Sequence, residues 1–148
     1  AHAAGRQVSI TLSDSFCVHR YRDEFRALIR DKVDIFFGNE TEIKALYEVD
    51  TFEEALEAAR REGKIAALTR SEKGSVVVKG SETHAVPAAP VAKVVDTTGA
   101  GDLYAAGFLF GLTHGKPLAE CARLGGIAAA EIISHVGARP EQALKALI

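Results

Sequence analysis

Asp96-Thr97-Thr98-Gly99-Ala100-Gly101-Asp102 is the most informative segment of the sequence, because it joins an extended segment to a helix through a glycine-rich turn. Val94-Val95 precedes it as the end of a predicted strand, and the apolar residues 103–108 follow as a predicted helix. Two glycines directly before a helix let backbone N–H groups point toward one spot, where the helix dipole adds partial positive charge. The local sequence therefore predicts an anion site suited to a phosphate.

Asp102 falls in the first turn of that predicted helix, beside the anion site. A carboxylate next to a phosphate is electrostatically unfavourable unless it has a chemical role. As a general base it could take a proton from a hydroxyl while backbone amides hold a transferring phosphoryl group. The alternative needs no chemistry: residues 99–101 form a tight turn, and Asp102 stabilises the helix N-terminus by about 0.3–1 kcal/mol. The residues alone leave both interpretations open.

Other catalytic motifs do not fit the chain. A Rossmann fingerprint would need a third glycine where Tyr104 stands, and a P-loop is broken by Pro117 after Gly115-Lys116. The Gly-x-Ser-x-Gly elbow of hydrolases does not occur in the sequence. The five histidines lack the spacing of metal ligands, so a dedicated histidine metal site is not expected.

Around this stretch, short apolar strands alternate with helical patterns. Strands are predicted at residues 8–12, 33–37, 65–69, 76–78 and 83–86, the last two as an antiparallel pair. Helices are predicted at residues 21–30, 41–48, 51–63, 102–112, 118–134 and 141–148. Strands that alternate with helices imply right-handed crossovers. We therefore expect an α/β fold whose mostly parallel sheet is flanked by helices.

Composition narrows the class of protein. The 148 residues are 47% hydrophobic and 26% charged, and 18 Lys+Arg against 20 Asp+Glu give a net charge of −2. Such a balance lacks the basic footprint of a nucleic-acid-binding protein. The longest apolar run, residues 103–112, is far shorter than the roughly 20 residues that span a bilayer. With two cysteines and no signal-peptide pattern, we expect a cytoplasmic protein without a membrane or nucleic-acid partner.

The stretch at residues 96–102, continued by Tyr104-Ala105-Ala106-Gly107-Phe108, resembles the C-terminal signature of the ribokinase (PfkB) family of carbohydrate and nucleoside kinases. The resemblance covers essentially the whole chain, and residues 12–16 and 34–42 are most similar to the adenosine kinase branch. It implies a ribokinase-like three-layer sandwich. It also implies ATP-dependent phosphoryl transfer to a primary hydroxyl of adenosine.

The resemblance assigns roles to the phosphate site. Asp102 would be the base that activates the acceptor hydroxyl. The implied anion hole consists of the backbone of Gly99, Ala100 and Gly101. Asn39 and Glu42 match the family's Asn-x-x-Glu region, which would help to hold Mg²⁺ and the ATP phosphates, largely through water. Asn-x-x-Glu is also a capping-box arrangement, and the two interpretations are compatible.

The resemblance also assigns a nucleotide loop at Thr69-Arg70-Ser71-Glu72-Lys73-Gly74. Thr69 and Gly74 match the family, whereas Ser71 stands where glycine is usual, and a purely structural turn between two strands is the alternative. Thr98 is assigned to the ATP site as well. The apolar helix at residues 128–133 would wall the adenine, although an alanine-rich stretch also suits close helix packing.

Some members of the family bind a monovalent cation such as K⁺ beside the anion hole. The matching positions, mainly through backbone carbonyls, are Asp96, Thr98, Ile132, His135 and Gly137.

Nothing in the sequence resembles the family's N-terminal half, which carries most acceptor-binding residues and the lid. The chain also has no Met and opens Ala1-His2-Ala3-Ala4-Gly5. We therefore expect residues 1–148 to be the C-terminal nucleotide-binding portion of a longer kinase, inactive alone, with the acceptor half and lid absent. A sugar kinase of the same family and a non-catalytic nucleotide-binding module are the alternatives. The expected partner is a small nucleoside or sugar, and a homodimer is left open.

Overall fold

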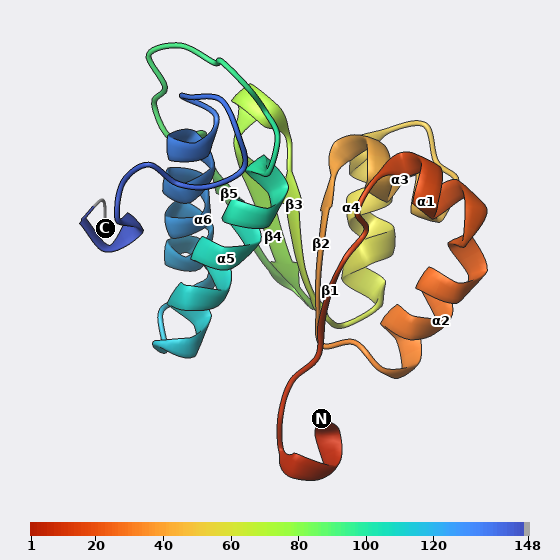
Figure 1. The fold of residues 1–148 in the computed structure, drawn as a ribbon. Helices are drawn as coiled ribbons and strands as arrows, with labels where there is room; N and C mark the ends of the chain where they lie inside the picture. The colour runs from red at the N-terminus through yellow and green to blue at the C-terminus, as the bar shows by residue number, and fades with distance from the viewer. Residues whose placement is uncertain (147–148) are drawn as a thin grey trace. The chain divides into compact units, whose positions relative to one another are not determined.

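A computed structural model describes residues 1–146 of the chain, in two compact units (Figure 1). The first unit comprises Ala1–Arg70 and Val76–Thr83, and the second comprises Ser71–Ser75 and the described residues from His84 onward. The elements in chain order are η1 (His2–Ala4), β1 (Ser9–Thr11), α1 (Ser15–Arg20), α2 (Arg22–Asp31), β2 (Ile35–Asn39), α3 (Glu40–Tyr47), α4 (Phe52–Arg61), β3 (Ile65–Thr69), η2 (Ser71–Lys73), β4 (Ser75–Lys79), β5 (Glu82–Val86), α5 (Ala100–Thr113), α6 (Leu118–Ile132) and η3 (Leu144–Ala146). Within residues 1–146, no helix has the length and apolar character needed to cross a membrane.

The strands form one five-stranded sheet in the order β1-β2-β3-β4-β5. β1 pairs in parallel with β2, and β2 pairs in parallel with β3, in a register that sets Asn39 beside Thr69. The links from β3 to β4 and from β4 to β5 are too short for a parallel crossover, which needs about a dozen residues. β4 therefore opposes its neighbours, while β1, β2, β3 and β5 share one direction. The predicted α/β fold with a mostly parallel sheet is confirmed.

The first unit is built around β2 and β3. Residues 35–38 and 65–68 are buried without alternation, which is the pattern of parallel strands covered on both faces. Helices α1 to α4 pack together beside these strands, and α3 contacts both β2 and β3 (Figure 1). The core of this unit includes the fully buried side chains of Leu12, Val18, Ile29, Phe36, Ile43, Leu46 and Leu68.

The second unit contains α5 and α6, which lie side by side (Figure 1). Glycines allow the two backbones to approach closely. A Cβ atom at Gly107 would lie 2.6 Å from the Leu124 carbonyl oxygen, and one at Gly125 would lie 2.7 Å from the Tyr104 carbonyl oxygen. The pair therefore packs through backbone contact at two turns of α5, which fixes the orientation of its N-terminal end.

Two local predictions are wrong, and one short helix was not predicted. Val94 and Val95 form no strand; they are 57% and 47% exposed, and the Val95 N–H donates to the Ile133 carbonyl at 2.8 Å instead of to a neighbouring strand. The helix that was not predicted is α1, which Asp14 caps by accepting the Cys17 N–H at 2.8 Å.

The helix predicted for residues 141–148 is also not found over its described part. Residues 141–143 lie outside any helix, and the short 3-10 helix η3 covers Leu144–Ala146. The backbone N–H groups of Glu141 and Gln142 are bonded to a side-chain carboxylate of α6, so they take no part in a helical turn. Residues 147 and 148 of this prediction lie outside the described residues.

Candidate active site

The N-terminus of α5 forms the turn that the sequence predicts. Gly99 is its N-cap residue, in the left-handed region with φ 81°, and no side chain caps the helix. The Gly99 carbonyl accepts the Leu103 N–H at 2.9 Å, and the Ala100 N–H donates to the Thr97 carbonyl at 3.2 Å. The first-turn N–H groups of Gly101 and Asp102 have no helical partner by geometry, so they remain available to an anion.

The two glycines of this turn differ in what requires them. A Cβ atom at Gly99 would lie 3.1 Å from the Ala138 Cβ, and the positive φ further disfavours any other residue. A Cβ atom at Gly101 would meet no atom within 4 Å, and its φ is not in the left-handed region. The packing of the described residues therefore explains Gly99 but gives no reason for glycine at position 101.

Asp102 lies in the first turn of α5 and is exposed. No side chain among residues 1–146 makes a described hydrogen bond or ion pair with its carboxylate. The carboxylate is therefore open to solvent beside the N–H groups of the same turn. The Asp102 carboxylate could therefore accept a proton from a hydroxyl held next to a bound phosphate.

Asp96 ties the start of the motif to the segment after α6. Its Oδ1 accepts the Thr98 N–H at 2.9 Å and the Thr98 hydroxyl at 2.7 Å, and its Oδ2 accepts the Gly137 N–H at 3.0 Å. These bonds, led by the one from Gly137, lower the pKa of Asp96 to about 2. The carboxylate therefore stays charged at neutral pH and holds two segments 41 residues apart.

The five positions matched to a cation site lie around this contact. Asp96 bonds directly to Thr98 and Gly137, Ile132 is the last residue of α6, and His135 follows in the same connection. Within residues 1–146 there is no group of three His, Cys, Asp or Glu side chains placed to hold a metal ion. A cation here would therefore depend on backbone carbonyls beside the charged Asp96, which is the donor set that the resemblance implies.

Asn39 and Glu42 form a complete capping box at the start of α3. Asn39 Oδ1 accepts the Glu42 N–H at 2.9 Å, and Glu42 Oε2 accepts the Asn39 N–H at 2.9 Å. The Asn39 amide also donates to Glu42 Oε1 at 2.7 Å. Burial raises the pKa of Glu42, and nearby Asp14 adds to the effect. Each carboxylate oxygen accepts one hydrogen bond and keeps a further lone pair, which could accept a hydrogen bond from a metal-bound water.

The predicted nucleotide loop begins where β3 ends. Thr69 lies beside Asn39 in the sheet, which brings two predicted ligands of the first unit together. Ser71 has φ 52°, in the left-handed region, and this explains why glycine is usual at its position. Gly74 has φ 86°, and a Cβ atom there would lie 2.7 Å from the Ala88 nitrogen, so it is needed structurally.

Two further residues hold these segments and were not predicted. The Arg70 guanidinium donates to Glu40 at 2.9 Å and stacks 3.9 Å from the centre of the Phe52 ring. Glu131 is buried in α6 and bonds to the segment after it. A signal for Glu131 was present, because it is a lone charge within the apolar run of residues 127–133. The partners of Arg70 lie too far away in sequence to be seen there.

The predicted residues fall into two groups. The first unit contains Asn39, Glu42 and Thr69. The second contains Ser71, Gly74, Asp96, Thr98, Gly99, Ala100, Gly101, Asp102, Ile132, His135 and Gly137.

Known proteins share both the sequence and the fold of this chain. The family model for pfkB family carbohydrate kinases matches residues 1–144. A cytidine kinase of Thermococcus kodakarensis is 35% identical over 142 residues, which cover 90% of this chain and 49% of that protein. The chain spans about half the length of the relatives that it matches.

Solved structures agree with this assignment. An adenosine kinase from Sinorhizobium meliloti is 56% identical with a TM-score of 0.96, covering 99% of this chain and 45% of that one. A probable sugar kinase from Rhizobium etli CFN 42 is 52% identical with a TM-score of 0.97, covering 99% and 44%. A ribokinase from Arabidopsis thaliana, complexed with ribose and ATP, is 25% identical with a TM-score of 0.73, covering 98% and 45%. The fold is therefore ribokinase-like, and the chain belongs to the pfkB family of carbohydrate kinases.

Proposed function

We propose that this chain carries the ATP site and catalytic base of an adenosine kinase-like enzyme, which transfers the γ-phosphoryl group of ATP to a primary hydroxyl of adenosine. One observation carries the proposal: α5 begins with open N–H groups at Gly101 and Asp102, and the exposed Asp102 carboxylate lies in the same turn. Family membership and the 56% identical adenosine kinase support this assignment.

The proposed chemistry follows from the start of α5. The N–H groups of Gly101 and Asp102 would hold the negative charge that the transferring phosphoryl group carries. The Asp102 carboxylate would accept the proton of the acceptor hydroxyl as the new O–P bond forms. Gly101 leaves open space where the phosphate would approach. Apart from its chain neighbours and the nearby backbone of α5, no atom of residues 1–146 lies within 4 Å of a Cβ built there.

ATP and Mg²⁺ are the proposed cofactors. The related ribokinase was crystallised with ATP, which supports ATP as the donor. Mg²⁺ would neutralise charge on the phosphates, with Asn39 and Glu42 bonding to its water shell. K⁺ is proposed to lie near Asp96, whose low pKa keeps a negative charge beside the matched carbonyls.

The adenine of ATP has a candidate pocket in the second unit. An apolar pocket of about 220 Å³ lies between α5, α6 and η3. Ala106, which lines it, lies one helical turn after Asp102 and on the same face of α5. Ile127 and Ala128 of α6 also line it, and Ala128 is the first residue of the predicted adenine wall at residues 128–133.

Other assignments compete with adenosine. The Rhizobium etli protein is a probable sugar kinase and the Thermococcus protein is a cytidine kinase. The identity of the acceptor therefore needs a test of its own. We further propose that the acceptor pocket is supplied by chain outside these residues, and that the protein acts in the cytoplasm. A nucleotide-binding module without catalysis is the second candidate function.

The base assignment is tested by turnover in a hybrid. Residues 1–148 replace the corresponding part of the Sinorhizobium meliloti adenosine kinase, to which they are 56% identical. ADP release is then measured with adenosine, cytidine, ribose and fructose. We expect adenosine to be preferred, and Asp102→Asn to reduce kcat by roughly a hundredfold or more with little change in ATP affinity. Retained turnover in Asp102→Asn would remove the base assignment, and no turnover in any hybrid that binds ATP would favour the module.

A further inference from the structure

Glu131 is an acidic residue among the apolar side chains of the last turns of α6, where Ala128 and Ile132 are also buried. Its side chain is 4% exposed, and its buried carboxylate oxygen Oε2 has no hydrogen-bond partner among residues 1–146. A buried carboxylate is costly unless hydrogen bonds compensate for the lost water. The bonds of its second oxygen therefore have to account for its presence.

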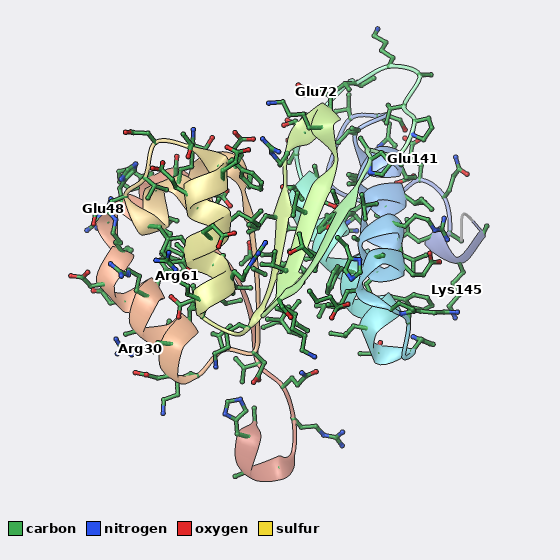
Figure 2. The ribbon with its side chains drawn as sticks, turned by 180° about the vertical axis from the view of Figure 1, so that it is seen from behind. Arg30, Glu48, Arg61, Glu72, Glu141 and Lys145 are labelled. Atoms are coloured by element: carbon green, nitrogen blue, oxygen red, sulfur yellow. The ribbon has the colours of Figure 1, made fainter. Side chains whose placement is uncertain are left out.

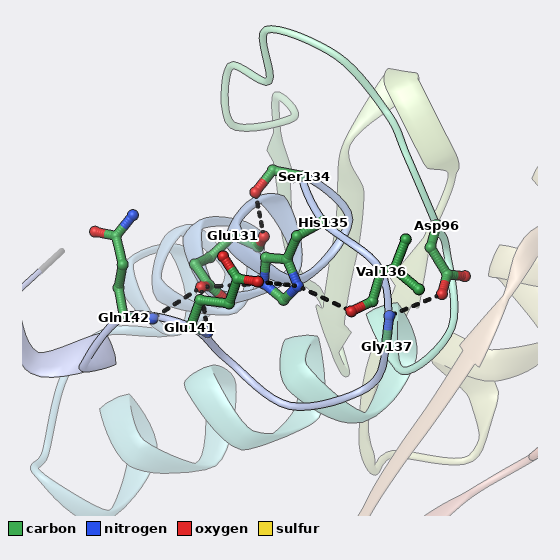
Figure 3. Close-up of polar contacts among 8 residues, drawn as sticks. All are labelled: Asp96, Glu131, Ser134, His135, Val136, Gly137, Glu141 and Gln142. Carbon is green, nitrogen blue, oxygen red and sulfur yellow. Dashed lines mark hydrogen bonds and ion pairs between the residues drawn. The ribbon is translucent and has the colours of Figure 1, made fainter.

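The second oxygen, Oε1, accepts hydrogen bonds from the segment that follows α6 (Figure 3). It accepts the backbone N–H of Glu141 at 2.8 Å and that of Gln142 at 3.1 Å, and His135 Nε2 lies 3.2 Å away. The two amides lie ten and eleven residues beyond Glu131. These bonds therefore close a loop, and Glu131 anchors the far end of residues 134–142.

The near end of the same loop is held by a different carboxylate. Asp96 Oδ2 accepts the Gly137 N–H at 3.0 Å (Figure 3). Between the two anchors lies Ala138, whose Cβ and Cα would lie 3.1 and 3.3 Å from a Cβ atom at Gly99. A continuous path of contacts thus leads from Glu131, through the loop, to the residue from which α5 starts.

We propose that Glu131 is a positioning residue for the phosphate site, an inference that rests on the proposed function. Its carboxylate holds residues 137–142 so that Ala138 packs against Gly99. Gly99 sets the turn that aims the N–H groups of Gly101 and Asp102. Without the anchor at Glu131, the loop gains freedom and the turn loses its support, so the phosphate is held less well.

The first test removes the Glu131 carboxylate, which accepts the hydrogen bonds of the loop. The affinity of the 148-residue chain for Mg·ATP is measured by calorimetry, and the exchange of backbone amides by NMR. Glu131→Ala is expected to raise the Kd for ATP roughly five- to tenfold, because the Glu141 and Gln142 amides lose their acceptor and the loop is no longer anchored. The Glu141 and Gln142 amides should exchange faster. Glu131→Gln keeps a carbonyl acceptor and is expected to restore most of the affinity.

A second pair of variants tests the same bond from the loop. Glu141→Pro removes the N–H that donates to Glu131. Glu141→Ala keeps this N–H and removes an exposed side chain whose carboxylate lies 3.9 Å from His135 Nδ1. We expect Glu141→Pro to weaken ATP binding several-fold and Glu141→Ala to leave it unchanged. Since both changes lie in an exposed loop, this pair decides the matter if Glu131→Ala does not fold.

The outcomes separate the two proposals. If the unaltered chain does not bind ATP, the proposed function fails and this inference falls with it. If the unaltered chain binds ATP, but Glu131→Ala and Glu141→Pro bind it equally well while their loop amides exchange faster, the proposed function stands. The positioning role of Glu131 is then overturned, because a loop freed from its anchor would have no effect on the phosphate site.

Discussion

At the scale of single residues, Gly99 and Gly101 allow the fold and the ligand site to be tested separately. Gly99→Ala is expected to cost about 1–2 kcal/mol of unfolding free energy, because alanine must adopt φ 81° and approach Ala138. Gly101→Ala adds a methyl group in open space and should leave stability unchanged or raise it by up to about 1 kcal/mol.

The same Gly101→Ala variant should lose ATP affinity by roughly tenfold or more, because its methyl group occupies the space that a phosphate needs. Urea unfolding and ATP calorimetry on both variants provide the comparison. A Gly101→Ala protein that is stable and binds ATP normally would contradict the proposed phosphate position.

Asp96 predicts a pH dependence of stability. Its folded pKa of about 2 lies below its ordinary value of 3.8, so the folded state binds its proton less readily than the unfolded state does. The stability that Asp96 contributes is therefore fully present above about pH 4 and is lost as the pH falls toward 2. Urea unfolding across this pH range should show a free energy of unfolding that depends less steeply on pH for Asp96→Asn than for the unaltered chain. An identical slope in both proteins would argue against the contacts of Asp96 with Thr98 and Gly137.

At the scale of elements, the contact between α5 and α6 depends on Gly107. A Cβ atom there would lie 2.6 Å from the Leu124 carbonyl oxygen and 2.9 Å from the Gly125 Cα. Gly107→Ala should therefore cost about 1–3 kcal/mol despite the better helix propensity of alanine. Gly126→Ala is the matched control, since its Cβ would meet only the Ala89 nitrogen at 4.0 Å, and it should gain up to about 1 kcal/mol. Equal thermal unfolding of the two variants would contradict the close approach of these helices.

The capping boxes of α3 and α4 form a second matched pair. Asn39 and Thr51 each accept the N–H of a glutamate three residues later. Asn39→Ala and Thr51→Ala should each cost about 1 kcal/mol of stability. We expect Asn39→Ala alone to weaken Mg·ATP binding, as measured by calorimetry. If both variants bind Mg·ATP like the unaltered chain, Asn39 serves only as a helix cap.

The elements that could be predicted from the sequence are those specified by local signals. β3 has its predicted bounds, Ile65–Thr69, because a short apolar run follows a helix stop at Gly63. The capping boxes at Asn39 and Thr51 were readable from residue spacing alone. The segment at Val94-Val95 was misassigned because β-branched residues favour a strand only where a neighbouring strand can pair with them.

The parts of the site that could not be predicted depend on distant partners. Asp96 contacts Gly137 across 41 residues, and Arg70 contacts Glu40 across 30. Neither spacing leaves a pattern in the chain. By comparison, Arg61 lies on α4 with an exposed side chain (Figure 2). The start of α5 could be predicted because its glycines and Asp102 are contiguous.

At the scale of the whole molecule, the chain matches about half the length of its relatives, and its candidate residues lie in two compact units. In the first unit, Asn39 and Thr69 lie side by side at the ends of neighbouring strands. In the second unit, α5 begins after Gly99 with Asp102 in its first turn. Ribokinase-like relatives share the fold over 98–99% of the chain.

The most direct test of the proposed phosphate site is an NMR titration of the ¹⁵N-labelled 148-residue chain with Mg·ATP. We expect the largest chemical-shift changes at the amides of residues 99–102, led by Gly101 and Asp102, whose N–H groups would donate hydrogen bonds to phosphate oxygens. If saturation with Mg·ATP shifts other amide resonances but leaves those of Gly101 and Asp102 unchanged, the proposed phosphate site is contradicted.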